Sequence, residues 1–119
     1  MSIIKFSPAE LFAAMPAATP APVPIGETIS QIAVKSFASA AAPSTRTGVW
    51  ECSPGRWRRQ VLAAEFCVFL EGDCVFEPDN GPAVRIAAGE AVYFPANTAG
   101  VWSIETKARK AYVIFDEAR

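Results

Sequence analysis

The sequence contains no histidine among its 119 residues. Imidazole is the only side chain whose unperturbed pKa lies close to neutrality, and it is the most frequent general base in enzymes. Without it the chain has no Ser-His or Cys-His pair for nucleophilic catalysis. Any proton donor or acceptor must therefore be a group whose pKa the fold shifts.

An excess of charge and long apolar runs are also absent. The net charge of −1 and the pI near 5.4 provide no basic face for nucleic acids or anionic membranes. No window reaches the roughly 18 apolar residues that a membrane span needs. Lys5 precedes an alanine-rich run, but Pro8 and Glu10 interrupt this run before it can form the apolar region of a signal peptide. We expect a cytoplasmic protein with neither a nucleic-acid partner nor a membrane partner.

The chain has an odd number of cysteines, and their spacing matches neither a zinc site nor a small disulfide framework. They are Cys52, Cys67 and Cys74. We interpret them as buried thiols that pack as small apolar side chains in a reducing compartment.

The composition, with 51% hydrophobic and 19% charged residues, indicates one globular domain. Residues 1–24 are rich in alanine and proline, which predicts a short helical turn over 8–15 and then an extended arm outside the core. Residues 28–38 alternate as a strand does, and residues 40–47 read as a connector of small residues. The domain itself is expected to span residues 25–119.

From Gly48 onward, short β-rich runs alternate with turn signals such as Ser53-Pro54-Gly55. This pattern predicts about eight or nine strands, and no later segment has a helical period. The fold class is therefore all-β, a sandwich or a barrel.

Residues 65–77, "EFCVFLEGDCVFE", read as a hairpin with Gly72 and Asp73 in its loop. Side chains alternate between the two faces of such a hairpin. One face carries Glu65, Cys67, Phe69, Cys74 and Phe76, and the other carries Phe66, Val68, Leu70 and Val75. Because both faces are apolar, the N-terminal arm or a second subunit should cover the outside. We expect a homodimer.

Two partial motifs frame the centre of this region. Glu65 is followed by six residues and Gly72, and Gly89 is followed by five residues and Pro95. These spacings are the second half of the first cupin motif and the first half of the second. Residues 47–115 therefore resemble the small cupins of the ureidoglycine aminohydrolase and ethanolamine-utilisation type. The resemblance implies an RmlC-like jelly-roll β-barrel, here with an extended N-terminal arm.

The same resemblance places the metal-binding histidines of cupins on other residue types. In cupins with intact motifs, three imidazoles and one carboxylate hold a metal ion, and a lone Glu65 cannot replace that set. The histidine positions fall on Arg58 and Gln60, or on Arg59 and Val61 with a shorter spacer, and on Gly100. We therefore predict no metal site and no cofactor.

Glu65 is the candidate catalytic acid or base. Burial raises the pKa of a carboxyl group unless a cation compensates, and either Arg58 or Arg59 could supply that cation. Neighbouring residues on a strand face opposite sides, so only one of these two arginines points inward. An inward arginine suits a carboxylate or phosphate on a small ligand. The alternative is a buried ion pair with no chemical role.

Aromatic residues complete the candidate site. Trp102 should share the interior with Gly100, where the missing imidazole opens space, and Tyr112 shares a face with Lys110 and Ile114. Such rings either line a pocket or fill a core. The predicted ligand-binding residues are Arg58, Gln60, Glu65, Cys67, Tyr93, Trp102 and Tyr112.

Three functions remain open from the sequence. The first is binding of a small polar metabolite (a carboxylate, a nitrogen-containing compound or a sugar) without metal, with Arg58 as anion clamp, Glu65 as internal acid or acceptor and Trp102 as wall. The second follows from the resemblance alone: an aminohydrolase or lyase that uses Glu65. The third is a structural or regulatory subunit with a filled barrel. The residues do not decide whether the protein is an enzyme.

Overall fold

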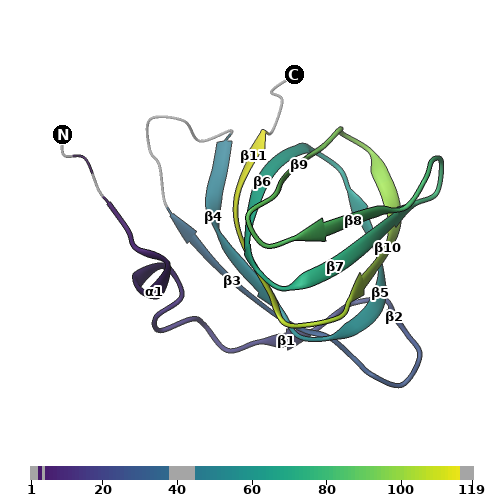
Figure 1. Ribbon diagram of the computed structural model, residues 1–119, viewed down its shortest axis with the longest axis horizontal. Helices are drawn as coiled ribbons and strands as arrows, with labels where there is room; N and C mark the ends of the chain where they lie inside the picture. The colour runs from purple at the N-terminus through teal and green to yellow at the C-terminus, as the bar shows by residue number, and fades with distance from the viewer. Residues whose placement is uncertain (1–2, 4, 38–44, 116–119) are drawn as a thin grey trace.

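Two antiparallel sheets curve toward each other and form a jelly-roll barrel, as Figure 1 shows for a computed structural model of the chain. The structure describes residue 3 and residues 5–37 and 45–115. One sheet has the strand order β1-β3-β4-β11-β6-β9, and the other has the order β2-β5-β10-β7-β8. The predicted all-β jelly roll is confirmed.

One short helix, α1 (Pro8–Leu11), precedes the strands. The strands of the N-terminal third are β1 (Thr19–Pro20), β2 (Pro24–Ile25) and β3 (Gln31–Phe37). The strands that follow are β4 (Thr45–Cys52), β5 (Gly55–Val61), β6 (Ala64–Glu71), β7 (Asp73–Pro78), β8 (Val84–Ala87), β9 (Ala91–Phe94), β10 (Thr98–Ile104) and β11 (Ala108–Phe115). The strand expected over 28–38 is thus β3. Residues 40–44 of the expected connector lie outside the described residues, and residues 45–47 begin β4.

Strand alternation decides which side chains enter the barrel. On β10, for example, Gly100, Trp102 and Ile104 are buried, whereas the residues between them are only partly so. The predicted inward face of residues 65–77 is confirmed, because its five members are all buried. The outward face is exposed or half-buried.

The predicted hairpin over residues 65–77 is wrong. Strand β6 pairs with β11 and β9, whereas β7 pairs with β10 and β8, so the chain crosses from one sheet to the other at Gly72. Gly72 has a φ of +97°, and a Cβ there would lie 2.5 Å from the carbonyl oxygen of Lys107. A glycine is therefore needed at this crossing, and the inward alternation of the two strands is the same as in a hairpin.

The N-terminal segment packs on the outside of the barrel beside β3 (Figure 1). Helix α1 has a capping box formed by Ser7 and Glu10, which the sequence analysis did not anticipate. Lys35 Nζ donates a hydrogen bond to the carbonyl oxygen of Ala13 at 2.6 Å, and the Arg109 guanidinium lies 4.9 Å from the centre of the Phe12 ring. These contacts attach α1 to the outer face of the larger sheet.

Part of the arm belongs to the core, contrary to the expectation that the arm stays outside it. Strand β1 pairs with β3 and β2 pairs with β5, so the arm adds an edge strand to each sheet. Ala21, between these strands, is buried in the core cluster, and Phe12 is buried under Arg109. The backbone pairing on either side of Ala21 carries this side chain inward although Pro20 and Pro22 flank it, whereas Phe12 is buried on the outer face.

The arm covers only part of the apolar outer face. Phe66, Tyr93 and Phe115 remain 44%, 59% and 42% exposed. The second subunit that the sequence analysis expected over this face stays a prediction.

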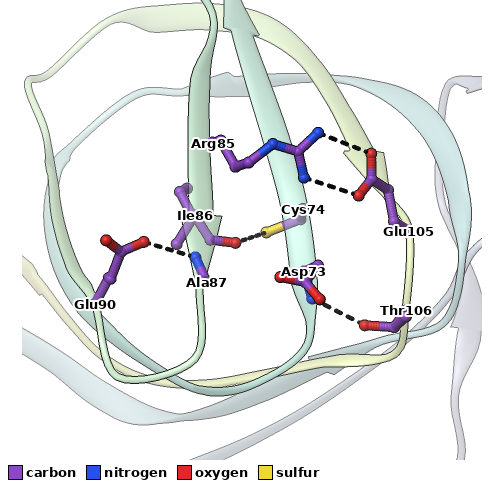
Figure 2. A network of polar contacts seen from close by, with 8 residues as sticks. All are labelled: Asp73, Cys74, Arg85, Ile86, Ala87, Glu90, Glu105 and Thr106. Carbon is purple, nitrogen blue, oxygen red and sulfur yellow. Dashed lines mark hydrogen bonds and ion pairs between the residues drawn. The ribbon is translucent and has the colours of Figure 1, made fainter.

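A polar network orders the turns next to β7 and β8 (Figure 2). Arg85 donates two hydrogen bonds to Glu105, at 2.9 and 3.3 Å, and the Asp73 amide donates to the Thr106 hydroxyl at 2.9 Å. The Ala87 amide donates to Glu90 at 2.8 Å. These groups are exposed, so the network contributes to turn geometry rather than to a site.

No helix among the described residues is long and apolar enough to cross a membrane.

Candidate functional site

Five aromatic side chains fill one part of the barrel interior. Trp102 is at their centre, with ring centroids of its neighbours between 5.0 and 6.2 Å away. We name this the aromatic cluster: Trp50, Phe69, Phe76, Phe94 and Trp102. Such contacts bury large apolar areas and favour tilted and edge-to-face geometry. Trp102 is therefore a core residue at the centre of the cluster.

Gly100 does not open space for a ligand, contrary to expectation. A Cβ at this position would lie 2.8 Å from Cζ of Phe76 and 2.8 Å from Cα of Pro78. The Phe76 ring and the neighbouring strand β7 therefore occupy the place beside the glycine.

A group of three charged side chains lies beside the aromatic cluster. Glu65 on β6 forms ion pairs with Lys110 on β11, at 2.8 Å between Nζ and Oε2, and with Arg59 on β5, at 3.1 Å between Nη2 and Oε1. We call Arg59, Glu65 and Lys110 the charged triad. Glu65 and Lys110 are each 1% exposed and Arg59 is 21% exposed. The triad joins both sheets, because β5 belongs to one and β6 and β11 to the other.

The two cations keep Glu65 ionised. Burial by itself would raise the pKa of the Glu65 carboxyl, but the charges of Lys110 and Arg59 outweigh it, so the pKa lies below its ordinary value of 4.5. This resolves the conditional expectation for Glu65: a cation compensates for burial. The group is a carboxylate near neutral pH and cannot donate a proton there.

Lys110 lines a cavity but was not among the predicted site residues. Its ammonium faces the rings of the aromatic cluster, with the Trp50 ring centre 4.5 Å from Nζ. Cation–π attraction and Glu65 both stabilise the charged amine. The 2.8 Å ion pair with Glu65 engages at most part of the ammonium's three donors, and no other described residue accepts a hydrogen bond from Nζ. Nζ is enclosed by these neighbours, so a ligand in the cavity reaches its remaining donors only after a small shift of the lining side chains.

A cavity of about 320 Å³ opens next to the triad, whose three members all line it. Its apolar wall consists of Val34, Trp50, Trp57 and Ile114. This volume is near the lower end of the range for small-molecule sites, about 300–1,000 Å³. The cavity therefore suits a small ligand with one charged end.

Two hydroxyl groups also line the cavity. Oη of Tyr112 and Oγ of Ser36 are 3.4 Å apart. Gly48 lies behind them, where a Cβ would be 2.8 Å from the Tyr112 hydroxyl oxygen, so the tyrosine needs a glycine at this point. Tyr112 is a predicted ligand-binding residue, and the structure places it at the cavity.

The family model for the EutQ-like cupin domain matches residues 40–112. The chain belongs to the EutQ-like cupin family. No curated protein matches its sequence significantly.

Solved structures with the same fold include the EutQ protein of Clostridium difficile, at 19% identity and a TM-score of 0.66, which covers 73% of this chain and 69% of that one. A protein of unknown function of the DUF861 family from Pseudomonas syringae pv. tomato has 22% identity and a TM-score of 0.75. That match covers 87% of this chain and 45% of the other. At these identities the similarity establishes the fold alone.

In this EutQ-like cupin, Arg59 rather than Arg58 faces the barrel interior. Strand β5 buries Trp57 and Val61, so Arg59 between them shares their inward face. Arg58 points outward and donates a hydrogen bond at 3.0 Å to Asp79. The prediction of Arg58 as an internal anion clamp is thus wrong. The shorter spacer of the first motif, which aligns Arg59 and Val61 with the histidines, fits the observed facing.

The remaining predicted residues are dispersed. Gln60 is exposed and lines a second hollow of about 200 Å³ that also reaches Arg59 and Glu65. Tyr93 lies on the outer face opposite Phe66, because β9 pairs with β6 in that register, and it lines a separate hollow of about 250 Å³. Neither Tyr93 nor Trp102 lines the cavity beside the triad. The structure thus brings together Glu65 and Tyr112 at that cavity and places Cys67 in the core nearby.

The thiols are poor ligands and nucleophiles in their surroundings. Burial raises the pKa of Cys67 to about 11 and that of Cys74 to about 12, and it also raises the pKa of Cys52. Metal coordination and nucleophilic attack both need the thiolate. All three cysteines are buried and free of disulfides, as expected.

The residues around Glu65 do not fit the metal ion that cupins with intact motifs hold. Among the residues that the structure describes, no three His, Cys, Asp or Glu side chains form a group that could hold one. The carboxylate that would be a ligand is instead neutralised by an ammonium and a guanidinium. A divalent cation beside Lys110 would meet like charge at short range.

Proposed function

We propose that this EutQ-like cupin binds a small polar metabolite in the cavity beside the charged triad, with the Lys110 ammonium in place of a metal ion. The observation that carries the proposal is the position of Lys110. It is a fully buried cation that lines a cavity and has donors without an aligned acceptor. A buried polar group of this kind is costly unless something satisfies it. A bound ligand would do so.

The alternative of an enzyme that uses Glu65 as an acid has less support. A carboxylate whose pKa is lowered by two cations is a weak base and has no proton to donate near neutrality. A structural subunit with a filled barrel is also less favoured, because the aromatic cluster leaves the cavity beside the triad open.

Metal content and thermal unfolding of the natively purified chain test the proposal together. We expect substoichiometric Mn, Fe, Ni and Zn by plasma mass spectrometry, and no change in Tm when EDTA is added. A panel of small carboxylates, amines and polyols at millimolar concentration should contain members that raise Tm, because a ligand that binds only the folded state stabilises it. One tightly held metal ion per chain, or a panel in which no compound raises Tm, would contradict the proposal.

We further propose that the protein is cytoplasmic and forms a homodimer through the outer face near Phe66 and Tyr93. Three buried, unpaired thiols support a reducing compartment. The exposed aromatic rings support a partner on that face. Light scattering after size exclusion should give twice the chain mass, and a Phe66→Ser, Tyr93→Ser variant should give the monomer mass. A monomeric wild-type protein at high concentration would contradict the dimer.

A further inference from the structure

We infer that the metabolite is a small monocarboxylate with an apolar body, whose carboxylate contacts Lys110 and Arg59. This inference rests on the proposed function and specifies the ligand class. The ligand classes compatible with the sequence also include nitrogen-containing compounds, of which amines are the charged members, and sugars. The charged side chains and the uncharged lining of the cavity distinguish among the three ligand classes: carboxylates, nitrogen-containing compounds and sugars.

The charge balance of the triad favours a monoanion. It contains two cations and one carboxylate, all at the cavity, so it carries an excess of one positive charge. Arg46 also lines the cavity and has an interaction of its own, so the balance is drawn from the triad alone. An amine would bring a third cation next to Lys110 and Arg59, whereas one carboxylate would neutralise the excess.

The geometry of Glu65 indicates that the two cations suit a carboxylate. They already contact its two oxygens, one each, at 2.8 and 3.1 Å. Lys110 keeps donors without an aligned acceptor, and a guanidinium has five N–H donors of which Nη2 serves Glu65. A second carboxylate on the cavity side would extend this arrangement, with charges of opposite sign as nearest neighbours.

The uncharged lining argues against a sugar. A sugar needs hydrogen-bond partners for several hydroxyls, but the uncharged hydroxyl groups of the described lining are those of Ser36 and Tyr112, which are close to each other. The rest of the uncharged lining consists of two aliphatic side chains and two indole rings. One indole, that of Trp57, adds a single buried N–H donor without a partner. The wall otherwise matches an alkyl or aryl group, and three uncharged polar groups are too few for the several hydroxyls of a sugar.

Isothermal titration with matched compounds tests the ligand class. The probes are 3-methylbutanoate, benzoate and 3-phenylpropanoate, each with its primary amide and its amine, together with erythritol. We expect at least one carboxylate to bind and its amide and amine to bind at least tenfold more weakly. An amide, an amine or erythritol that binds as tightly as the carboxylates would overturn the inference and leave the proposed function intact. No heat with any probe, together with no Tm shift in the panel above, would overturn both.

Two variants locate the carboxylate, and the chain supplies a matched control. Lys110→Met and Arg59→Met should each weaken binding of the carboxylate roughly ten- to hundredfold, because each removes a charge-assisted hydrogen bond. Arg58→Met removes the adjacent, outward arginine of the same strand and should leave affinity unchanged. Circular dichroism verifies folding, and Arg59→Met remains informative if Lys110→Met fails to fold because Arg59 is partly exposed. Equal losses in Arg58→Met and Arg59→Met would overturn the assignment.

Discussion

The aromatic cluster and the charged triad are neighbours inside one barrel, yet they depend on different physics. The cluster is stabilised by burial and ring contacts, which are distributed over many neighbours and need no charge balance. In the triad, Glu65 is tolerated only because Lys110 and Arg59 neutralise it, and Lys110 is tolerated only because of Glu65 and the rings. The comparison teaches that the cluster stabilises the fold through apolar burial, whereas the triad carries a desolvation cost that its ion pairs must offset.

The largest expected effect comes from breaking the cluster. Trp102→Ala removes the central ring and leaves a cavity, so we expect the free energy of unfolding to fall by about 3–5 kcal/mol. Urea unfolding measures the loss. Leu62→Ala, at a side chain that is 70% exposed, should change the free energy of unfolding by less than about 0.5 kcal/mol. If Trp102→Ala lowers the free energy of unfolding no more than Leu62→Ala does, the interior is not packed as described.

A somewhat smaller loss is expected from breaking the triad. Glu65→Gln removes the counter-charge of two cations, and because water in the cavity can solvate them in part, we expect a loss of about 3 kcal/mol. The double variant Glu65→Gln, Lys110→Met should recover part of that loss, since it removes one of the uncompensated charges. Additive losses in the double-mutant cycle would show that Glu65 and Lys110 are not coupled.

Acid should reproduce the effect of Glu65→Gln. The pKa of Glu65 is lowered in the folded state, so the carboxylate stabilises the protein above its unfolded pKa, and this contribution is lost as pH falls through the folded pKa. The window therefore lies below pH 4.5. The difference in unfolding free energy between wild type and Glu65→Gln should be constant near pH 7 and should shrink as the pH falls below 4.5. A constant difference down to pH 2 would contradict the assignment.

The smallest effect is expected outside the barrel. Arg58 and Asp79 form an ion pair with side chains 45% and 43% exposed, where solvent screens the charges. Arg58→Met should leave the urea midpoint within experimental error of wild type. A clear loss would mean that the outer pair matters more than its exposure indicates, and that it is an unsuitable control for Arg59→Met.

Most of the fold could be predicted from local sequence patterns. Turn residues mark the strand ends, and alternation correctly assigned Glu65, Cys67 and Phe69 to the interior. The hairpin prediction failed because alternation reports which way a side chain faces, not which strand is the neighbour. Gly72 is compatible with a tight loop and with a crossing between sheets, and only the tertiary contact with Lys107 distinguishes them.

The site could be predicted only in part. Glu65 was recognisable from its motif spacing. Which of Arg58 and Arg59 faces the interior was left open, because the two possible spacer lengths of the motif differ by one residue. The buried Trp57 and Val61 settle that choice, and as apolar neighbours they were the available signal. Lys110 was missed because lysine is rarely buried and its partner is distant in the chain. The available sequence signal for its burial was strand alternation, which places Lys110 on the same face as Tyr112.

Because the Lys110 ammonium is part of the chain, it affects the stage of folding at which the proposed site is fully assembled. In the proposed site the cation belongs to β11, so it enters the barrel with that strand during folding and needs no separate loading step. Chelators cannot remove it, and a competing ion cannot exchange with it. The positive charge at this position is encoded by the gene and does not depend on the concentration of a metal ion in the cell.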